Sequence, residues 1–391
     1  MDRYSKRLRE LLVYPFEKLD RAAEEVRNKG IKTIDFGVGD PDFPPPEILK
    51  SSLIQAIDSY RYYAYPSYTG EKSLRKAFCE YFRNRFGVEL DYETECLVLI
   101  GTKEGIAHLP AAIINPGDLV MGVSPGYPVY KAGTLLADGI YKELPLVEEN
   151  RWLPSVLDID KNAKLLFLNS PSNPTGTIYP DEIFQDMIDL SLKNNTIIAN
   201  DAAYSEIYFD TPPKSILEFK NAKKVAVEFH SASKTFSVPG FRIGFLVGNS
   251  DVISALSAVK RNIDSGQFIP LQLALVNLYS TPSVTELIRN RYSKRRELFL
   301  SNLPDWELPS ATFYLWKRIK DGYTSSEFCR NLIESKGIIA LPGNGLGTTG
   351  EGYVRFSLTL DESDIIEGSK RIAHFLKNKL FTMCLLMILL F

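Results

Sequence analysis

The chain is organised around the stretch Ser231-Ala232-Ser233-Lys234-Thr235-Phe236, which continues through Pro239-Gly240-Phe241-Arg242. The stretch begins where the apolar run 225–229 ends, so we expect Lys234 to lie just past the end of a buried strand. A lysine amine can form a Schiff base with an aldehyde, and nearby serines and an arginine can bind a phosphate. By itself the hexapeptide is weak evidence, because 46 residues are Lys or Arg and most such residues lie on solvated surfaces.

Two upstream stretches predict further polar residues at strand ends. The apolar run 196–199 leads to Asp201, and the run 164–168 leads into a Pro/Gly turn that contains Asn173. The spacing between Asn173, Asp201 and Lys234 is about one βα unit in each case. Ligands of open α/β sheets bind at the carboxyl ends of the strands. The sequence therefore predicts an amide, a carboxylate and an amine along one rim.

With these motifs the chain resembles the class I and II pyridoxal-phosphate aminotransferases of fold type I. The resemblance covers nearly the whole chain and keeps the family's order and spacing. The matching motifs are Ser170-Pro-Ser-Asn173-Pro-Thr-Gly176, Asp201-x-x-Tyr204, Ser231-x-Ser233-Lys234 with Arg242, and Gly352-Tyr-Val-Arg355-Phe-Ser357. The resemblance implies an α/β fold, with a large domain whose mostly parallel sheet is covered by helices on both faces, and a small α+β domain built from both termini.

Alternating strand and helix patterns favour a mostly parallel sheet on their own account. We expect an N-terminal arm and part of the small domain in 1–43, the large cofactor-binding domain in 44–282 and the small domain in 283–379. Residues 380–391 form an apolar tail, shorter than the ~20 residues that a membrane-spanning helix needs. Packing of the tail on the protein, or an irregularity of the sequence, is favoured over membrane contact, and no function follows for it.

The chemistry of transamination assigns roles to five of these residues. Asp201 would keep the ring nitrogen of the cofactor protonated, and Tyr204 and Asn173 would donate hydrogen bonds to the ring hydroxyl. The amine of Lys234 would hold the cofactor and then move the substrate proton. Arg355 offers two parallel N–H groups to the α-carboxylate of the substrate. The predicted catalytic residues are thus Lys234, Asp201 and Tyr204.

Other predicted contacts come from loops. Residues 101–105 open a helix whose free N–H groups and positive dipole end suit a phosphate. By the resemblance, Tyr127 stacks on the cofactor ring, and Tyr65 reaches the cofactor of a partner subunit, which implies a homodimer with shared active sites. The predicted cofactor-binding residues are Tyr65, Thr102, Lys103, Tyr127, Asn173, Asp201, Tyr204, Ser231, Ser233, Lys234 and Arg242, and the predicted substrate-binding residues are Tyr14, Gly39, Asn173 and Arg355.

Composition excludes several other classes of protein. A net charge of −2 gives no reason to expect nucleic acid or an anionic membrane as a partner. The four cysteines are scattered and the three histidines lack ligand spacing, so we expect no metal site and a reducing, cytoplasmic compartment.

Within the family, the segments 101–110, 125–130 and 311–316 most closely resemble LL-diaminopimelate aminotransferases. This resemblance implies LL-2,6-diaminopimelate as amino donor, a 2-oxo acid such as 2-oxoglutarate as acceptor, and a place in lysine biosynthesis. Ser170 and Asn200 depart from the family's usual residues, which bears on the substrate more than on the reaction.

Two alternatives stay open. The same scaffold serves aspartate, alanine and aromatic aminotransferases and carbon–sulfur β-lyases, which differ only in the substrate side-chain pocket. A regulatory protein with an aminotransferase-like sensor domain is disfavoured, because the motifs start within the first 40 residues and leave no room for a DNA-binding domain.

Overall fold

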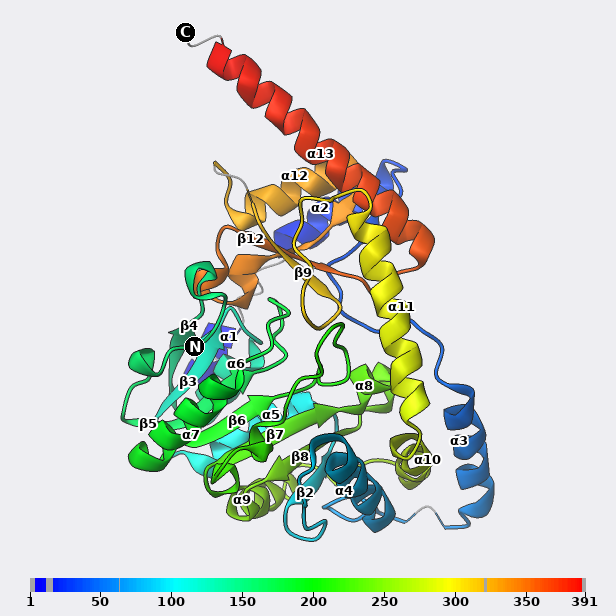
Figure 1. Ribbon diagram of the computed structural model, residues 1–391, viewed down its shortest axis with the longest axis vertical. Coiled ribbons are helices and arrows are strands. Elements are labelled where there is room, and N and C mark those ends of the chain that lie inside the picture. The colour runs from blue at the N-terminus through cyan, green and yellow to red at the C-terminus, as the bar shows by residue number, and fades with distance from the viewer. Residues whose placement is uncertain (1–3, 12–16, 63, 320–321, 389–391) are drawn as a thin grey trace.

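A seven-stranded sheet forms the centre of the computed structural model, which describes residues 4–11, 17–62, 64–319 and 322–388 (Figure 1). All of its strands run parallel except β8, which is antiparallel to both neighbours. In spatial order the strands are β2 (Cys96–Leu99), β8 (Gly244–Gly248), β7 (Ala226–Ser231), β6 (Ile197–Asp201), β5 (Ala163–Asn169), β3 (Leu119–Ser124) and β4 (Ile140–Pro145). The predicted α/β fold with a mostly parallel sheet is confirmed.

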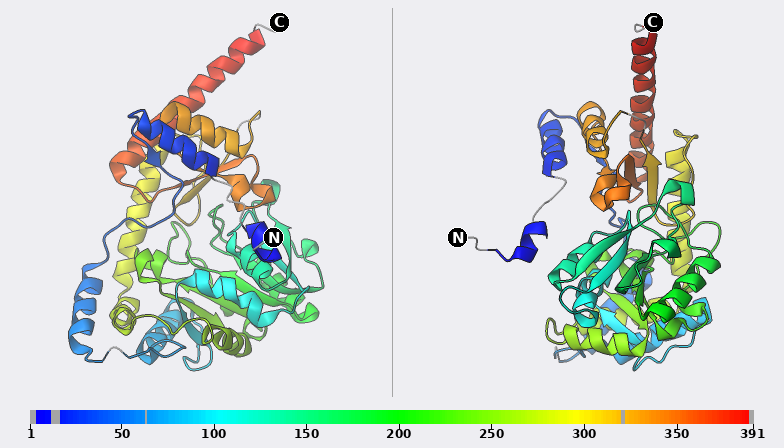
Figure 2. Two further views of the ribbon diagram at one scale, coloured as in Figure 1. Left: turned by 180° about the vertical axis from the view of Figure 1, so that it is seen from behind. Right: turned by 90° about the vertical axis from the view of Figure 1, so that its left-hand side faces the viewer.

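Helices cover both faces of this sheet (Figures 1 and 2). The helices that contact its strands are α4 (Lys72–Phe86), α5 (Thr102–Ile113), α6 (Val129–Leu136), α7 (Asp181–Asn194) and α9 (Ser250–Lys260). The short α8 (Ala232–Thr235) follows β7, α3 (Glu47–Ser59) packs on α10 (Ile269–Tyr279), and α11 (Pro282–Leu300) leads to the small region (Figure 1). On one face, Gly105 of α5 lies against the side chains of Leu99 and Phe229. On the other face, Phe78 of α4 stacks on Phe245 of β8, with ring centroids 3.9 Å apart. Burial of both faces explains why the strands are almost continuously apolar.

The central strands end at one level. Asn169, the last residue of β5, pairs with Asp201 of β6, and Asp201 pairs with Phe229 of β7. Lys234 follows in α8, directly after β7. The carboxyl ends of three neighbouring strands therefore form one rim that carries polar side chains.

A smaller region combines the two ends of the chain, as expected (Figure 1). Strand β1 (Ile34–Asp35) pairs in parallel with β10 (Ile338–Ile339). A three-stranded antiparallel sheet lies beside this pair, with the order β11 (Leu341–Pro342), β12 (Tyr353–Ser357) and β9 (Tyr314–Arg318). Helices α2 (Glu17–Asn28), α12 (Ser325–Lys336) and α13 (Glu362–Ile388) belong to this region, whereas α1 (Lys6–Leu11) lies against α6 of the large region, where Arg7 donates to the carbonyl of Leu136 at 3.1 Å (Figure 1).

Strands β10 and β11 are close in the chain but have different partners, because β10 pairs with β1 whereas β11 pairs with β12. One expectation for this region needs correction. The last turns of α13 extend away from the body, so the described part of the tail, 380–388, does not fold back onto the small region (Figures 1 and 2). Its leucines and methionines favour helix, and no Gly or Pro interrupts them. Within the described ranges, no helix is long and apolar enough to cross a membrane.

Candidate active site

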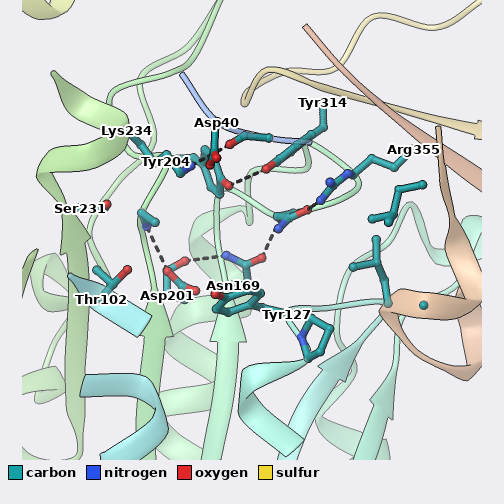
Figure 3. Close-up of a pocket in the computed structure, with 17 residues that line it drawn as sticks. Asp40, Thr102, Tyr127, Asn169, Asp201, Tyr204, Ser231, Lys234, Tyr314 and Arg355 are labelled. Atoms are coloured by element: carbon teal, nitrogen blue, oxygen red, sulfur yellow. Dashed lines mark hydrogen bonds between the residues drawn. The ribbon is translucent and has the colours of Figure 1, made fainter. Parts of the chain in front are cut away.

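A cavity of about 340 Å³ lies between the rim of the large sheet and the small region (Figure 3). It brings together residues from the N-terminal loop, the strand ends β5, β6 and β7, and the small sheet. Its lining residues are Gly39, Asp40, Thr102, Tyr127, Pro128, Asn169, Asn173, Asp201, Ala203, Tyr204, Ser231, Lys234, Tyr314, Leu341, Gly345, Leu346 and Arg355.

Asp201 is the buried carboxylate of this cavity. Tyr130 donates its hydroxyl to Asp201 Oδ2 at 2.9 Å, and the backbone N–H of Ala203 donates to Oδ1 at 3.2 Å. Burial raises the pKa of Asp201 to about 6, although these two hydrogen bonds act in the opposite direction. The side chain is therefore an ionisable acid at the floor of the cavity, suited to pair with a protonated nitrogen.

Lys234 supplies the amine. Its Nζ donates to the carbonyl of Gly39 at 2.8 Å and lies over the ring of Phe313. Burial lowers the pKa of Lys234, while Tyr314 and Asp40 act to raise it. A buried amine whose pKa is lowered spends more time in the neutral form, which is the form that attacks carbonyl groups.

Arg355 on β12 reaches across from the small region. Its Nη1 donates to Asn173 Oδ1 at 3.0 Å, and its Nη2 donates to the carbonyl of Gly37 at 2.8 Å. The guanidinium also lies 4.1 Å from the ring centroid of Tyr314. Its Nε is buried and has no hydrogen-bond partner among the described residues. Arg355 thus presents a fixed, buried cation to the cavity.

The N-terminus of α5 forms another wall. Gly101 precedes this helix with φ +72°, and a Cβ there would lie 2.2 Å from Nη2 of Arg242. Only glycine lets the guanidinium approach the helix end so closely. Thr102 and Ser231 line the same side of the cavity. Free helix N–H groups, a guanidinium and two hydroxyls are a suitable set for an anion such as a phosphate.

Two tyrosines lie on the opposite side. The hydroxyls of Tyr204 and Tyr314 are 3.0 Å apart, and burial raises the pKa of Tyr204, with a further contribution from Tyr314. Tyr127 presents its ring to the cavity, and burial raises its pKa to about 12. Tyr204 and Tyr127 therefore act as neutral hydrogen-bonding or stacking groups at neutral pH.

Comparison with known proteins agrees with this arrangement. The family model described as aminotransferase class I and II matches residues 31–372. The chain belongs to the class I and II aminotransferases. It is 45% identical to the LL-diaminopimelate aminotransferase of Halothermothrix orenii over 94% of this chain and 97% of that one. It is 43% identical to the enzyme of the same name from Aquifex aeolicus, over 96% and 99% of the two chains. The structure of substrate-bound BacF from Bacillus subtilis is similar, with a TM-score of 0.89 and 31% identity, over 96% and 98% of the two chains.

The chain is accordingly a transaminase, and most of the predicted site residues line the cavity of this aminotransferase. They are Gly39, Thr102, Tyr127, Asn173, Asp201, Tyr204, Ser231, Lys234 and Arg355. Arg242 lies against the adjoining Gly101. Ser233 is buried and Lys103 is exposed, and neither lines the cavity. Tyr65 is 88% exposed and outside the cavity of its own chain. Tyr14 lies outside the described residues.

Sequence reasoning missed several lining or supporting residues. Asn169 ends β5 as Asp201 ends β6, so the strand-end rule that identified Asp201 could have identified Asn169 as well. Tyr130 is buried on α6 and supports Asp201 from behind, and nothing in its local sequence signals that contact. Tyr314 enters from β9, and only the packing of the two regions brings it to Tyr204.

Proposed function

We propose that this aminotransferase uses pyridoxal 5'-phosphate to move the amino group of LL-2,6-diaminopimelate to a 2-oxo acid, 2-oxoglutarate being the expected acceptor. The observation that carries the proposal is the presence of Lys234, Asp201 and Arg355 in one cavity. The donor is suggested by the names of relatives that are 45% and 43% identical over nearly the whole chain. The same names suggest a role in lysine biosynthesis.

The residues of the cavity fit this cofactor. Lys234 Nζ is positioned to hold its aldehyde, and Asp201 to accept a hydrogen bond from its protonated ring nitrogen. The N-terminus of α5, Ser231 and Arg242 are available for its phosphate. When bound, the cofactor supplies an electron-withdrawing ring that accepts the charge released at the substrate Cα.

The remaining lining residues complete the site. Tyr127 offers an aromatic face, and Tyr204 offers a hydroxyl. Because Asn173 Oδ1 already accepts from Arg355, the amide NH₂ of Asn173 is the part of the side chain left to donate. Asn173 and Tyr204 can therefore donate to an oxygen in the cavity, which supports their proposed role at the ring hydroxyl.

The substrate is expected to bind from the side of the small region. Arg355 can pair with its α-carboxylate through the two-pronged geometry that arginine provides. Lys234 Nζ, once free, is the base proposed to take the proton from the substrate Cα and return it to the cofactor side. Leu341 and Leu346 line the cavity and would help to exclude water.

A cytoplasmic homodimer belongs to the same proposal. Tyr62 and Tyr65 are 81% and 88% exposed, and Ile54 on α3 is 54% exposed, so these large side chains are available for contact with a second subunit. Cys79, Cys96 and Cys329 are buried free thiols, which suits a reducing compartment.

A donor screen tests the proposal. The purified protein is mixed with 2-oxoglutarate and either LL-diaminopimelate, aspartate, alanine or an aromatic amino acid, and glutamate formation is measured. The highest kcat/KM is expected for LL-diaminopimelate. A higher value for another donor would replace the proposed substrate, and release of a thiol with pyruvate and ammonia from cysteine S-conjugates would indicate a β-lyase.

A further inference from the structure

The charged groups of the cavity are two acids and two bases among the described residues that line it: Asp40, Asp201, Lys234 and Arg355. Three of them are engaged. Asp201 accepts from Tyr130 and Ala203, Lys234 donates to Gly39, and Arg355 donates to Asn173 and Gly37. Asp40 differs, because its carboxylate takes part in no hydrogen bond or ion pair within the described part of the chain.

The contrast with Asp42, two residues further on, is informative. Asp42 forms a two-pronged ion pair with Arg295, with distances of 2.6 and 2.7 Å, and this pair anchors the loop to α11. The side chain of Asp40 is exposed at the cavity wall, between the Gly39 carbonyl that holds Lys234 and the anchored Asp42 (Figure 3). The loop is therefore held firmly while one of its carboxylates is left available to the cavity.

An ordinary α-amino acid leaves the carboxylate of Asp40 without a partner. The α-carboxylate of such a substrate is matched by Arg355, and its amine is the group that reacts. A diamino dicarboxylic acid brings a second ammonium, whose transfer from water into the cavity is costly unless a carboxylate binds it. Asp201 is buried at the floor and engaged, so Asp40 is the lining carboxylate that can serve.

We propose that the carboxylate of Asp40 binds the distal ammonium of a diamino dicarboxylic acid and so selects such donors over amino acids with an uncharged or purely acidic side chain. The inference rests on the proposed function and adds a specificity-determining residue to it. It differs from a role in the chemistry, because the distal ammonium takes no part in proton or amino transfer.

Two donors that differ in one group test the contact between Asp40 and the distal ammonium. LL-2,6-diaminopimelate and L-2-aminopimelate have the same chain length and both carboxylates, and differ only in the distal amino group; aspartate is a second reference. kcat and KM are measured for wild type, Asp40→Asn, Asp40→Glu and the control Asp158→Asn, which changes an exposed aspartate outside the cavity. Because a hydrogen bond to a charged group is worth about tenfold or more in affinity, Asp40→Asn should raise KM for LL-diaminopimelate about tenfold. The two reference donors should change less than twofold, Asp40→Glu should recover part of the loss, and Asp158→Asn should behave as wild type.

Binding without turnover gives a second measurement. In the Lys234→Ala background, the dissociation constants of LL-diaminopimelate and 2-aminopimelate are measured by calorimetry with and without Asp40→Asn. Only the binding of LL-diaminopimelate should weaken. An equal loss for all donors would mean that Asp40 acts on Lys234 or on the reacting amine, and would overturn the inference. Unchanged constants for LL-diaminopimelate would overturn it too. Failure of the wild type to use LL-diaminopimelate is a separate result, which would remove the proposed substrate and this inference with it.

Discussion

Asp201 and Arg355 belong to different sheets, yet three hydrogen bonds connect them through two asparagines. Asn169 donates to the carbonyl of Asp201 at 2.7 Å, the backbone N–H of Asn173 donates to Asn169 Oδ1 at 2.7 Å, and Arg355 donates to Asn173 Oδ1 at 3.0 Å (Figure 3). The proposed cofactor acid and the proposed substrate anchor are thus held at a fixed separation, which favours a reacting geometry that is prepared before the substrate binds.

Replacement of Lys234 tests the covalent role. Lys234→Ala should abolish the visible absorbance of the cofactor-loaded protein and reduce activity by several orders of magnitude, while the fold is kept. Borohydride reduction of the wild type followed by peptide mass spectrometry should place the label on Lys234. A labelled peptide that lacks Lys234 would refute the assignment.

Arg355→Lys should raise KM for the amino acid and the oxo acid alike. A lysine keeps the charge but loses the two-pronged fit, a loss of roughly 1.5–3 kcal/mol. It also leaves Asn173 Oδ1 and the Gly37 carbonyl without their donors. Steady-state kinetics with both substrates, alongside cofactor affinity, is the measurement. Cofactor affinity should change much less than KM, and unchanged kinetics would mean that the carboxylate binds elsewhere.

Replacement of Asp201 should have opposite effects on the stability of the cofactor-free protein and on activity. Its folded-state pKa is raised from 3.8 to about 6, so its charge disfavours folding of the cofactor-free protein. This cost is fully present above about pH 6 and disappears as the pH falls below 3.8, where the acid is protonated in both states. Asp201→Asn should therefore stabilise the cofactor-free protein at pH 7, by roughly 1–2 kcal/mol after loss of part of the Tyr130 and Ala203 hydrogen bonding.

Denaturant unfolding at pH 7 and pH 4 checks this prediction, and the gain should shrink at the lower pH. The same variant should bind the cofactor weakly and have almost no activity. A destabilised variant at pH 7 would mean that the hydrogen bonds of Asp201 outweigh the cost of its burial.

Glu143 should help to hold the small region against the large one. Its Oε2 accepts from the backbone N–H of Thr348 at 3.1 Å and from the Thr348 hydroxyl, and Gly126 donates to the carbonyl of the adjacent Leu346 at 2.7 Å. Leu346 lines the cavity, so these contacts hold the loop 343–350 against the cavity. Glu143→Gln should weaken the contact by ~1 kcal/mol, because Thr348 is exposed.

The expected results for Glu143→Gln are faster hydrogen exchange in 343–350 and a rise of a few fold in KM for every substrate. Glu149→Gln, on an exposed turn away from the cavity, is the matched control. If the loop of Glu143→Gln exchanges hydrogen at the wild-type rate, the other contacts are enough to hold it in place.

Replacement of Tyr65 tests whether two subunits contribute to one active site. Its exposure in the single chain agrees with a role across a subunit interface. Tyr65→Ala and Lys234→Ala are each expected to be nearly inactive. If the two variants are dissociated and reassociated together, hybrid dimers should regain one site with both native residues. Activity above that of either parent is the expected result, whereas inactive hybrids, confirmed by mass, would exclude a contribution from the partner.

The sequence alone determined the local elements and the residues at their ends. Apolar runs followed by polar residues predicted Asp201 and Lys234 at strand ends. A strand that is buried on both faces needs apolar side chains at consecutive positions, so such a strand is visible in the sequence. Tertiary structure decided which of these groups meet. The contact of Arg355 with Asn173, the pair Tyr204 and Tyr314, and the support of Asp201 by Tyr130 join segments far apart in the chain. Likewise, only packing distinguishes Asp42, which is paired with Arg295, from Asp40, which is left to the cavity. Such contacts depend on strand order and on how the small region sits on the large sheet, and neither leaves a periodic signal in the sequence.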